Sequence, residues 1–132
     1  MDTYVELEML PEHTCLQCGL HGGTEKKVAI TSAPHVFMLH ISRFDTGLQK
    51  IHKYVEFPQH LTTDHIRSGN GQSLDYRLRR LIVNVGLSIA KGHNIPYTVI
   101  NENWYKTDDR TATRISWQRV STLQAYILLY EI

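Results

Sequence analysis

The most constraining feature of the sequence is a hairpin pattern between residues 92 and 109. Two β-rich segments, Tyr97–Ile100 and Trp104–Lys106, flank the polar tripeptide Asn101-Glu102-Asn103, which is typical of a tight turn between antiparallel strands. The pair Gly92-His93 precedes the first segment, and the pair Asp108-Asp109 follows the second. Neighbouring antiparallel strands bring such residues within reach of one another. The pattern therefore predicts an imidazole beside a carboxylate on adjacent strands.

A histidine oriented by a carboxylate is two thirds of a nucleophilic triad. The acid fixes the tautomer of the ring and stabilises its charged form, while the other ring nitrogen activates a nucleophile. A lone histidine at a strand end is usually an ordinary surface residue, and only the order of the motifs favours a catalytic interpretation of His93. An activated Cys or Ser ahead of His93 is not evident. The sequence thus predicts a base and an orienting acid without their nucleophile.

Composition excludes several classes of function. Apolar residues make up 42% of the 132 residues and the formal net charge is +1, which indicates a globular chain. The basic pairs Lys26-Lys27 and Arg79-Arg80 are typical of solvated surface and not of a nucleic-acid interface. No apolar run approaches the roughly 18 residues of a membrane span, and no secretory signal pattern appears. We therefore expect one intracellular domain, in the cytoplasm or nucleus, with neither a nucleic-acid nor a membrane partner.

The rest of the chain is rich in predicted strands and poor in helix. A polar, glycine-rich loop is expected over Ser68–Gln72, and one short helical turn within Ile115–Val120. The pattern favours a mostly antiparallel sheet. The further strand candidates are Tyr4–Glu8, Lys27–Thr31, His35–Ile41, a turn and strand within 45–56 that ends at Phe57-Pro58, Tyr76–Gly86 and Ala125–Tyr130.

The only two cysteines, Cys15 and Cys18, form a Cys-x-x-Cys pair in the lead-in over residues 1–26. Two cysteines at this spacing do not indicate the disulfide framework of a secreted protein. Zn²⁺ takes four tetrahedral ligands in structural sites, and one such pair supplies two of them. Three alternatives follow: His13 and His21 complete the ligand set, the knuckle holds no metal, or the metal is shared with another chain.

Taken in order, the motifs resemble those of the catalytic domain of ubiquitin-specific proteases, the papain-like cysteine deubiquitinases. The resemblance runs from about Cys15 to Tyr130. The boxes that carry it are Cys15-x-x-Cys18, Ala33–Phe44, Lys50-Ile51, Val55–Pro58, Gly92-His93-Asn94, Trp104-Tyr105, Asp108-Asp109 and Ala125–Tyr130.

The resemblance implies an α+β fold dominated by β-structure. It would be the antiparallel, palm-like sheet half of a papain-like cysteine protease, with a remnant of the zinc-binding fingers. We expect a single domain over 1–132, in which residues 1–26 form the lead-in and knuckle and residues 27–132 form the β-rich half that bears the histidine and the acids.

The resemblance also implies roles for individual residues. His93 would be the general base, Asp108 the residue that orients it, and Asp109 an auxiliary polar residue of the same catalytic site. Gly92 would let the backbone pass close to the tail of a bound ubiquitin, because glycine has no Cβ. Cys15 and Cys18 would be the partial ligand set of a structural zinc. The residues expected to bind substrate are Gly92, Asn94 and Tyr97.

The sequence departs from the family pattern in two ways. The family's nucleophile lies in an Asn-x-x-Cys box at the start of the domain, whose Asn also stabilises the oxyanion, and this chain has no such box. Asn94, Pro96 and Thr107 stand where the family usually has an aromatic residue, a small residue and Phe. These changes are expected to loosen the packing that holds His93.

Two functions remain open on the sequence alone. In the first, the chain is the C-terminal half of a thiol hydrolase that cleaves peptide and isopeptide bonds after ubiquitin. A separate front half would then supply the cysteine and cover the exposed apolar face of the sheet. In the second, the chain is a catalytically dead module that binds ubiquitin, a ubiquitin-like protein or another partner. The isolated chain is expected to be inactive, because no acyl-enzyme forms without a nucleophile.

Overall fold

The computed structural model describes residues 7–28, 32–63, 73–88 and 91–132. Its contacts divide the chain into two compact units. The first unit contains Met1–Ala33 and Thr63–Ser73, and the second contains Pro34–Thr62 and Leu74–Ile132. That residues 1–132 fold as a single domain stays a prediction.

The first unit is built around a short antiparallel hairpin. β1 (Glu8–Leu10) pairs with β2 (Thr24–Lys26), and an ion pair of 3.0 Å joins Lys26 Nζ to Glu8 Oε2 across the two strands. The strand expected over Tyr4–Glu8 lies mostly outside the described residues, as does most of the strand expected over Lys27–Thr31. β2 itself ends at Lys26, before the expected second strand begins.

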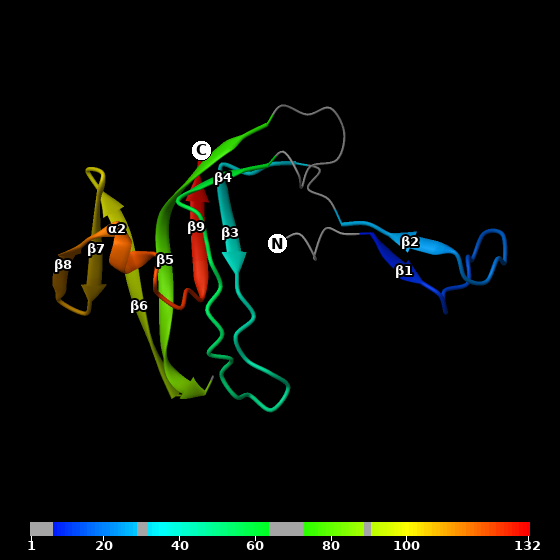
Figure 1. The fold of residues 1–132 in the computed structure, drawn as a ribbon, viewed down its shortest axis with the longest axis horizontal. Helices are drawn as coiled ribbons and strands as arrows, with labels where there is room; N and C mark the ends of the chain where they lie inside the picture. Colours follow the sequence, from blue (N-terminus) through cyan, green and yellow to red (C-terminus); the bar gives the residue numbers. More distant parts are fainter. Residues whose placement is uncertain (1–6, 29–31, 64–72, 89–90) are drawn as a thin grey trace. The chain divides into compact units, whose positions relative to one another are not determined.

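The second unit is a seven-stranded sheet, so the prediction of a β-dominated fold is confirmed. The strand order is β3-β9-β5-β6-β7-β8, with β4 paired to β5, and every pairing is antiparallel (Figure 1). The expected loop at Ser68–Gln72 lies outside the described residues. The strands are β3 (Val36–His40), β4 (His60–Thr62), β5 (Asp75–Ser88), β6 (Lys91–Ile100), β7 (Asn103–Asp108), β8 (Thr111–Ile115) and β9 (Ile127–Glu131).

The hairpin between β6 and β7 has the predicted tight turn. Its two connecting residues, Asn101 and Glu102, have φ values of 47° and 59°, as a two-residue turn of the type I′ class requires. The turn matches the right-handed twist of the flanking strands. It therefore sets the register in which Val99 faces Trp104 and Tyr97 faces Lys106.

One predicted strand is wrong. Residues 51–58 are not part of any strand, although the sequence pattern favoured one there. Side chains from elsewhere in the unit take up backbone carbonyls of this segment. Arg43 Nη1 donates to Lys53 O at 2.7 Å, and Gln124 Nε2 donates to His52 O at 3.0 Å. These contacts hold the segment without a strand partner.

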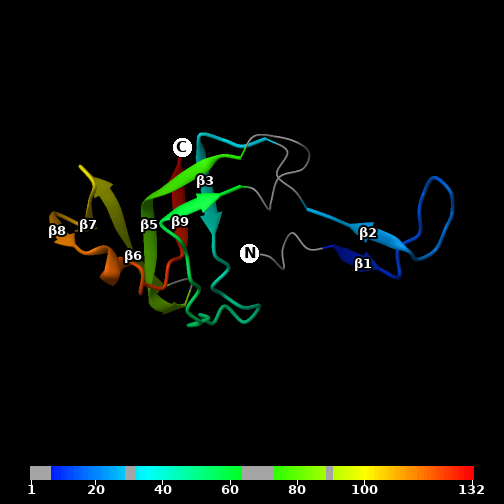
Figure 2. The same ribbon diagram turned by 45° about the horizontal axis from the view of Figure 1, so that its top comes forward.

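β8 is an edge strand that the sequence did not predict. Its five residues, Thr111–Ile115, are exposed except for the last, so the strand lacks the apolar alternation by which strands are recognised. The helical turn predicted after it is confirmed as α2 (Trp117–Val120). Val120 is fully buried, and the ring of Trp117 lies 5.8 Å from the ring of Trp104, so α2 contributes to the core. The ribbon runs from β8 through this helical turn to β9 (Figure 2).

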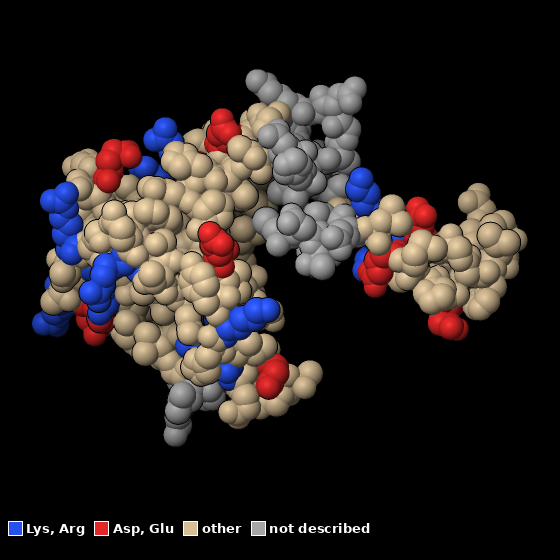
Figure 3. All heavy atoms as spheres, in the orientation of Figure 1, with Lys and Arg blue, Asp and Glu red and all other residues tan. Residues whose placement is uncertain are grey.

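β3 carries the exposed apolar surface that the sequence led us to expect. It ends the strand order of the sheet and pairs with β9. Val36 and Met38 on one of its faces are 47% and 62% exposed, while Phe37 and Leu39 on the other face are partly buried. The visible face of the second unit has charged groups at scattered positions around a broad uncharged area (Figure 3).

Within the described residues, no helix has the length and apolar character that crossing a membrane requires. The intracellular location stays a prediction.

Candidate functional site

The structure brings His93 and Asp108 together, as the hairpin pattern predicts. His93 lies near the start of β6 and Asp108 at the end of β7, and His93 Nε2 is 3.0 Å from Asp108 Oδ1. The two side chains are 53% and 33% exposed, so the pair lies at the surface and is open to a partner. With Nε2 bonded to the acid, Nδ1 is the ring nitrogen left to exchange a proton with a second group.

Pro96 explains how the acid reaches a histidine that is not directly opposite to it. The β6–β7 ladder ends at the pair Tyr97↔Lys106, and the next residue of β6, Pro96, has no backbone N–H to continue it. Thr107 Oγ1 instead donates to Pro96 O at 3.2 Å. The strands are thereby held together beyond the ladder, in the stretch where Asp108 meets His93.

The second carboxylate oxygen of Asp108 is also bound. Lys106 Nζ lies 3.0 Å from Asp108 Oδ2, and both residues project from the same face of β7 because they are two positions apart. The hydrogen bonds from His93 and then from Lys106 lower the pKa of Asp108. The same carboxylate raises the pKa of Lys106. The acid is therefore held ionised between two donors.

Asp109 joins the same cluster. One ligand atom each of His93, Asp108 and Asp109 lie within 4.8 Å of one another. Asp109 has a φ of 48°, in the left-handed region that Asp tolerates better than most residues, and it occupies the turn between β7 and β8. An auxiliary role for Asp109 beside the pair stays a prediction, with a geometry that permits it.

The structure gives a reason for glycine at position 92 that the sequence did not reveal. A Cβ on Gly92 would lie 2.7 Å from Asn84 Nδ2 and 2.9 Å from Asn84 Oδ1. Asn84 is 8% exposed and donates from Nδ2 to Asn94 Oδ1 at 2.9 Å across the β5–β6 pairing. The side chain of Asn84 therefore fills the space above Gly92 and ties down the residue that follows His93.

The three departures from the family pattern are each tied by polar contacts. Asn94 accepts from Asn84, and Thr107 donates to Pro96. The changes expected to loosen the packing around His93 thus coincide with hydrogen bonds to β5 and between β6 and β7. Asn94 is exposed, whereas Tyr97 is 6% exposed and forms part of the core. The assignment of Gly92, Asn94 and Tyr97 to substrate binding stays a prediction.

The Cys-x-x-Cys pair forms a tight knuckle between β1 and β2. Cys15 N–H donates to Leu20 O at 2.9 Å, Gly19 N–H donates to Cys15 O at 2.8 Å, and Gly19 has a φ of 70° that suits glycine. Hydrogen bonds from Cys18 and the neighbouring backbone lower the pKa of Cys15. This favours the thiolate form that a metal binds.

Among the described residues, His13 and His21 are not gathered with Cys15 and Cys18 into a group of three or more donors, and completion of the zinc site by these histidines stays a prediction. Within residues 7–28, 32–63, 73–88 and 91–132, the cluster around His93 is the one place where three His, Cys, Asp or Glu donors gather. His13 Nδ1 lies 3.2 Å from Thr24 Oγ1, and His21 Nδ1 lies 2.8 Å from Thr14 Oγ1. The knuckle therefore fits one half of a tetrahedral zinc site.

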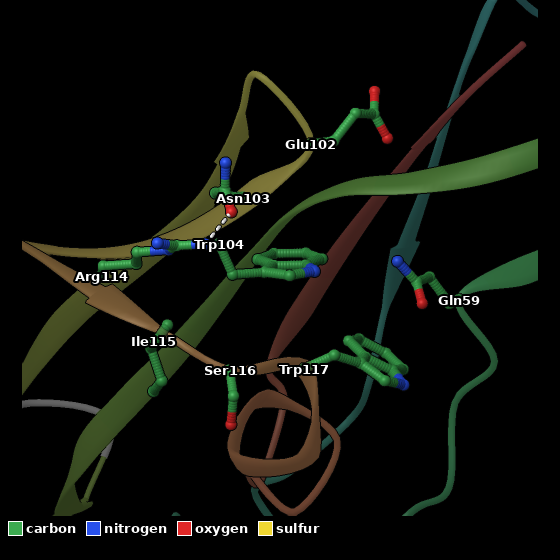
Figure 4. Close-up of a pocket in the computed structure, with 8 residues that line it drawn as sticks. All are labelled: Gln59, Glu102, Asn103, Trp104, Arg114, Ile115, Ser116 and Trp117. Atoms are coloured by element: carbon green, nitrogen blue, oxygen red, sulfur yellow. Dashed lines mark hydrogen bonds between the residues drawn. The ribbon is translucent and has the colours of Figure 1, made fainter.

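A separate pocket lies at the opposite end of the β6–β7 hairpin. It has a volume of about 440 Å³ and is lined by Trp104, Trp117, Gln59 and the Asn103–Arg114 pair, among others (Figure 4). Arg114 Nη2 donates to Asn103 Oδ1 at 2.5 Å on its wall. Another cavity, of about 530 Å³, lies beside Asn84 and is lined by Lys50, whose Nζ donates to Asn84 O.

Two residues of the site were missed by sequence reasoning. Lys106 stands two positions before Asp108, and same-face spacing on a strand is a signal that would have pointed to it. Asn84 is a polar residue within the apolar run Leu81–Val85, which is unusual for a buried strand. The contact of Asn84 with Asn94 depends on the pairing of β5 with β6, whereas that of Lys106 with Asp108 lies within β7.

Comparison with known proteins supports the resemblance seen in the motifs. A family model described as ubiquitin carboxyl-terminal hydrolase matches residues 2–130. Ubiquitin carboxyl-terminal hydrolase 16 of Arabidopsis thaliana is 32% identical over 123 residues, which cover 90% of this chain and 12% of that protein. Ubiquitin carboxyl-terminal hydrolase 17-like protein 15 of Homo sapiens is 30% identical over 136 residues, which cover 98% of this chain and 25% of that protein. The chain thus spans a quarter or less of these two relatives.

Solved structures share the fold. A SAGA DUB module of Ubp8, Sgf11, Sus1 and Sgf73 bound to monoubiquitin contains a chain with a TM-score of 0.87 and 28% identity. A SAGA module of the same four proteins bound to ubiquitin aldehyde gives a TM-score of 0.87 at 26% identity. In both cases 99% of the present chain is covered, against 31% and 32% of the matched chain. The predicted palm-like sheet half is thereby confirmed as the fold.

Proposed function

Because this chain belongs to the ubiquitin carboxyl-terminal hydrolase family, we propose that it supplies the histidine–aspartate part of a cysteine-type deubiquitinase. The observation that carries the proposal is the 3.0 Å contact between His93 Nε2 and Asp108 Oδ1 at an exposed position. A separated pair would leave the imidazole without an orienting acid. An exposed, oriented imidazole is what a general base requires.

The nucleophile of this reaction is a cysteine supplied by sequence beyond these 132 residues. Nδ1 of His93 takes the proton of that thiol, and the thiolate attacks the carbonyl carbon of the last residue of ubiquitin. The protonated ring then gives its proton to the leaving amine, and a thioester remains. Water, deprotonated by the same nitrogen, releases ubiquitin with a free carboxylate and restores the thiol. Asp108 stabilises the charged ring in both halves of the cycle.

Ubiquitin is the partner that fits the proposal best, with further protein partners on the apolar surface of β3. Two of the solved structures with this fold hold ubiquitin or ubiquitin aldehyde together with three other proteins. The exposed Val36 and Met38 offer a surface for a polypeptide that completes the domain.

Zinc enters the proposal as a structural group. Cys15 and Cys18 would hold it, with two further ligands from residues outside this chain, and the metal would cross-link the knuckle to that second segment.

A chimeric enzyme tests the proposal. The matched segment of Arabidopsis ubiquitin carboxyl-terminal hydrolase 16 is replaced by this chain, and hydrolysis of a ubiquitin C-terminal amide is measured. We expect activity that His93→Gln lowers by about 10²- to 10⁴-fold, the usual contribution of a general base. A chimera that binds ubiquitin yet shows no activity, or one in which His93→Gln is silent, contradicts the catalytic role and favours the inactive ubiquitin-binding module.

A second experiment uses this chain alone. We expect no covalent adduct with a ubiquitin probe that carries a thiol-reactive C-terminal group, because Cys15 and Cys18 belong to the knuckle. An adduct at either cysteine would overturn the assignment of the knuckle to metal binding.

A further inference from the structure

Lys106 makes the contact that distinguishes this site from a simple histidine–acid pair. Its Nζ lies 3.0 Å from Asp108 Oδ2, while His93 Nε2 lies 3.0 Å from Asp108 Oδ1. Each oxygen of the carboxylate therefore has its own donor. The three side chains are between 33% and 53% exposed, so the cluster faces solvent as a unit.

Two donors restrict a carboxylate more than one does. Rotation about the terminal torsion of an aspartate is broad, so a group held by one oxygen samples several orientations. Binding the second oxygen fixes the plane of the group, and Oδ1 stays directed at the imidazole. The strand supplies this restraint at little cost, because Lys106 and Asp108 share a face of β7 and the ladder holds Lys106 opposite Tyr97.

The charge of Lys106 matters as well as its hydrogen bond. An ammonium beside a carboxylate favours the ionised acid, and the charge-assisted bond is stronger than a neutral one. The other groups around the acid are His93 from β6, Asp109 from the turn, and the uncharged Thr111, which pairs with Asp108 from β8. Thr111 Oγ1 donates to the backbone oxygen of Asp108 at 2.9 Å and leaves the carboxylate free for its two donors.

We propose that Lys106 is a positioning residue, which holds the carboxylate of Asp108 in the plane and the charge state that orient His93. The proposal rests on the proposed function, in which His93 is the base, because orientation of the ring matters only to a reacting or binding histidine. Lys106 does not touch the reacting atoms in this scheme. It acts through Asp108.

The test compares Lys106→Met, which keeps the length of the side chain and removes its charge, with Lys106→Arg, which keeps the charge and the donors. Lys26→Met is the control for the loss of one positive charge, since Lys26 is paired with Glu8 in the other unit. The pKa of Asp108 is measured from its side-chain ¹³C shift, and the tautomer of the neutral His93 ring from its ¹⁵N shifts. Amide spectra of all variants verify the fold.

We expect Lys106→Met to raise the pKa of Asp108 and to reduce the population of the Nε2–H tautomer. Lys106→Arg should retain most of both properties, and Lys26→Met should change neither. A Lys106→Met variant that matches the unsubstituted chain in both readouts overturns the proposal, as does an equal effect of Lys26→Met. Both readouts are made without ubiquitin, so they stand or fall independently of the hydrolytic activity.

Discussion

The side chain of Asn84 occupies the space that a β-carbon on Gly92 would need, with Nδ2 2.7 Å from that position. The glycine of the Gly-His motif is thus required by its neighbour on β5. Gly92 is not among the described glycines that have a positive φ. Crowding by the side chain of Asn84, and not the backbone conformation, therefore accounts for a glycine at this position.

Substituting Gly92 by Ala should therefore destabilise the fold by about 1–3 kcal/mol, the usual cost of overpacking a filled site. Gly47→Ala is the matched control, because the nearest atom to its Cβ position is the flexible end of Asp45, at 3.3 Å. Urea unfolding measures both. In an Asn84→Ala background the cost of Gly92→Ala should shrink, since the obstructing amide is gone. An equal cost in the two backgrounds would show that the crowding is not the reason.

Arg43 should be essential to the segment that the sequence wrongly predicted as a strand. Arg43 is 2% exposed, and its guanidinium donates to Ala125 O at 2.5 Å and to Lys53 O at 2.7 Å. Each hydrogen bond to a charged group is worth about 1.5–3 kcal/mol. Arg43→Met should lower the free energy of unfolding by about 3 kcal/mol or more, and Arg43→Lys should not restore it, because an ammonium lacks the forked geometry.

Unfolding in urea tests the prediction for Arg43. A Lys variant as stable as the unsubstituted chain would mean that charge alone, and not the fork, holds the segment.

The pH dependence of stability should carry the signature of Asp108. The hydrogen bonds from His93 and Lys106 depress the pKa of its folded form, so its stabilising contribution is complete above the unfolded value of about 3.9. That contribution is lost as the pH falls through the lower folded pKa. Asp108→Asn should therefore flatten the acid side of the stability profile, measured by urea unfolding at a series of pH values. Parallel profiles for the two proteins would argue against the bridged carboxylate.

Removal of metal should not destabilise the chain on its own. Two thiolates from Cys15 and Cys18 make half of a tetrahedral zinc site, and His13 and His21 are engaged elsewhere. We expect a chelator to leave the melting temperature of the isolated chain unchanged. A fall in melting temperature that Cys15→Ser abolishes would show that this chain assembles a complete site by itself.

Much of the fold could be predicted from the sequence. Most strands are rich in β-branched and aromatic residues, and the polar residues Asn101-Glu102 indicate the turn between β6 and β7. β8 escaped prediction since an edge strand of exposed polar residues has no apolar period. The segment 51–58 was misassigned because side chains outside it, Arg43 and the sequence-distant Gln124, take up its carbonyls in place of a strand partner. A contact of that kind depends on tertiary structure and leaves no local pattern.

The candidate site divides in the same way. His93 and Asp108 were predicted from their order around a hairpin, and the structure brings them to 3.0 Å. Asn84 was not predicted, because its role comes from cross-strand neighbours that follow from register, and Lys106 was missed although its same-face spacing from Asp108 is visible in the sequence. The roles of Thr107 and Pro96 likewise depend on the hydrogen bond that Thr107 Oγ1 donates to Pro96 O across the two strands.

The most direct test of the account is to titrate the isotope-labelled chain with ubiquitin and to follow the amide of Gly92 and the ring of His93 by NMR. The account predicts saturable changes at both positions, which disappear when ubiquitin lacks its C-terminal glycine residues. The absence of any change at Gly92 and His93, or changes that persist without the ubiquitin tail, would contradict the claim that His93 and Asp108 form the part of the site at which the ubiquitin bond is cleaved.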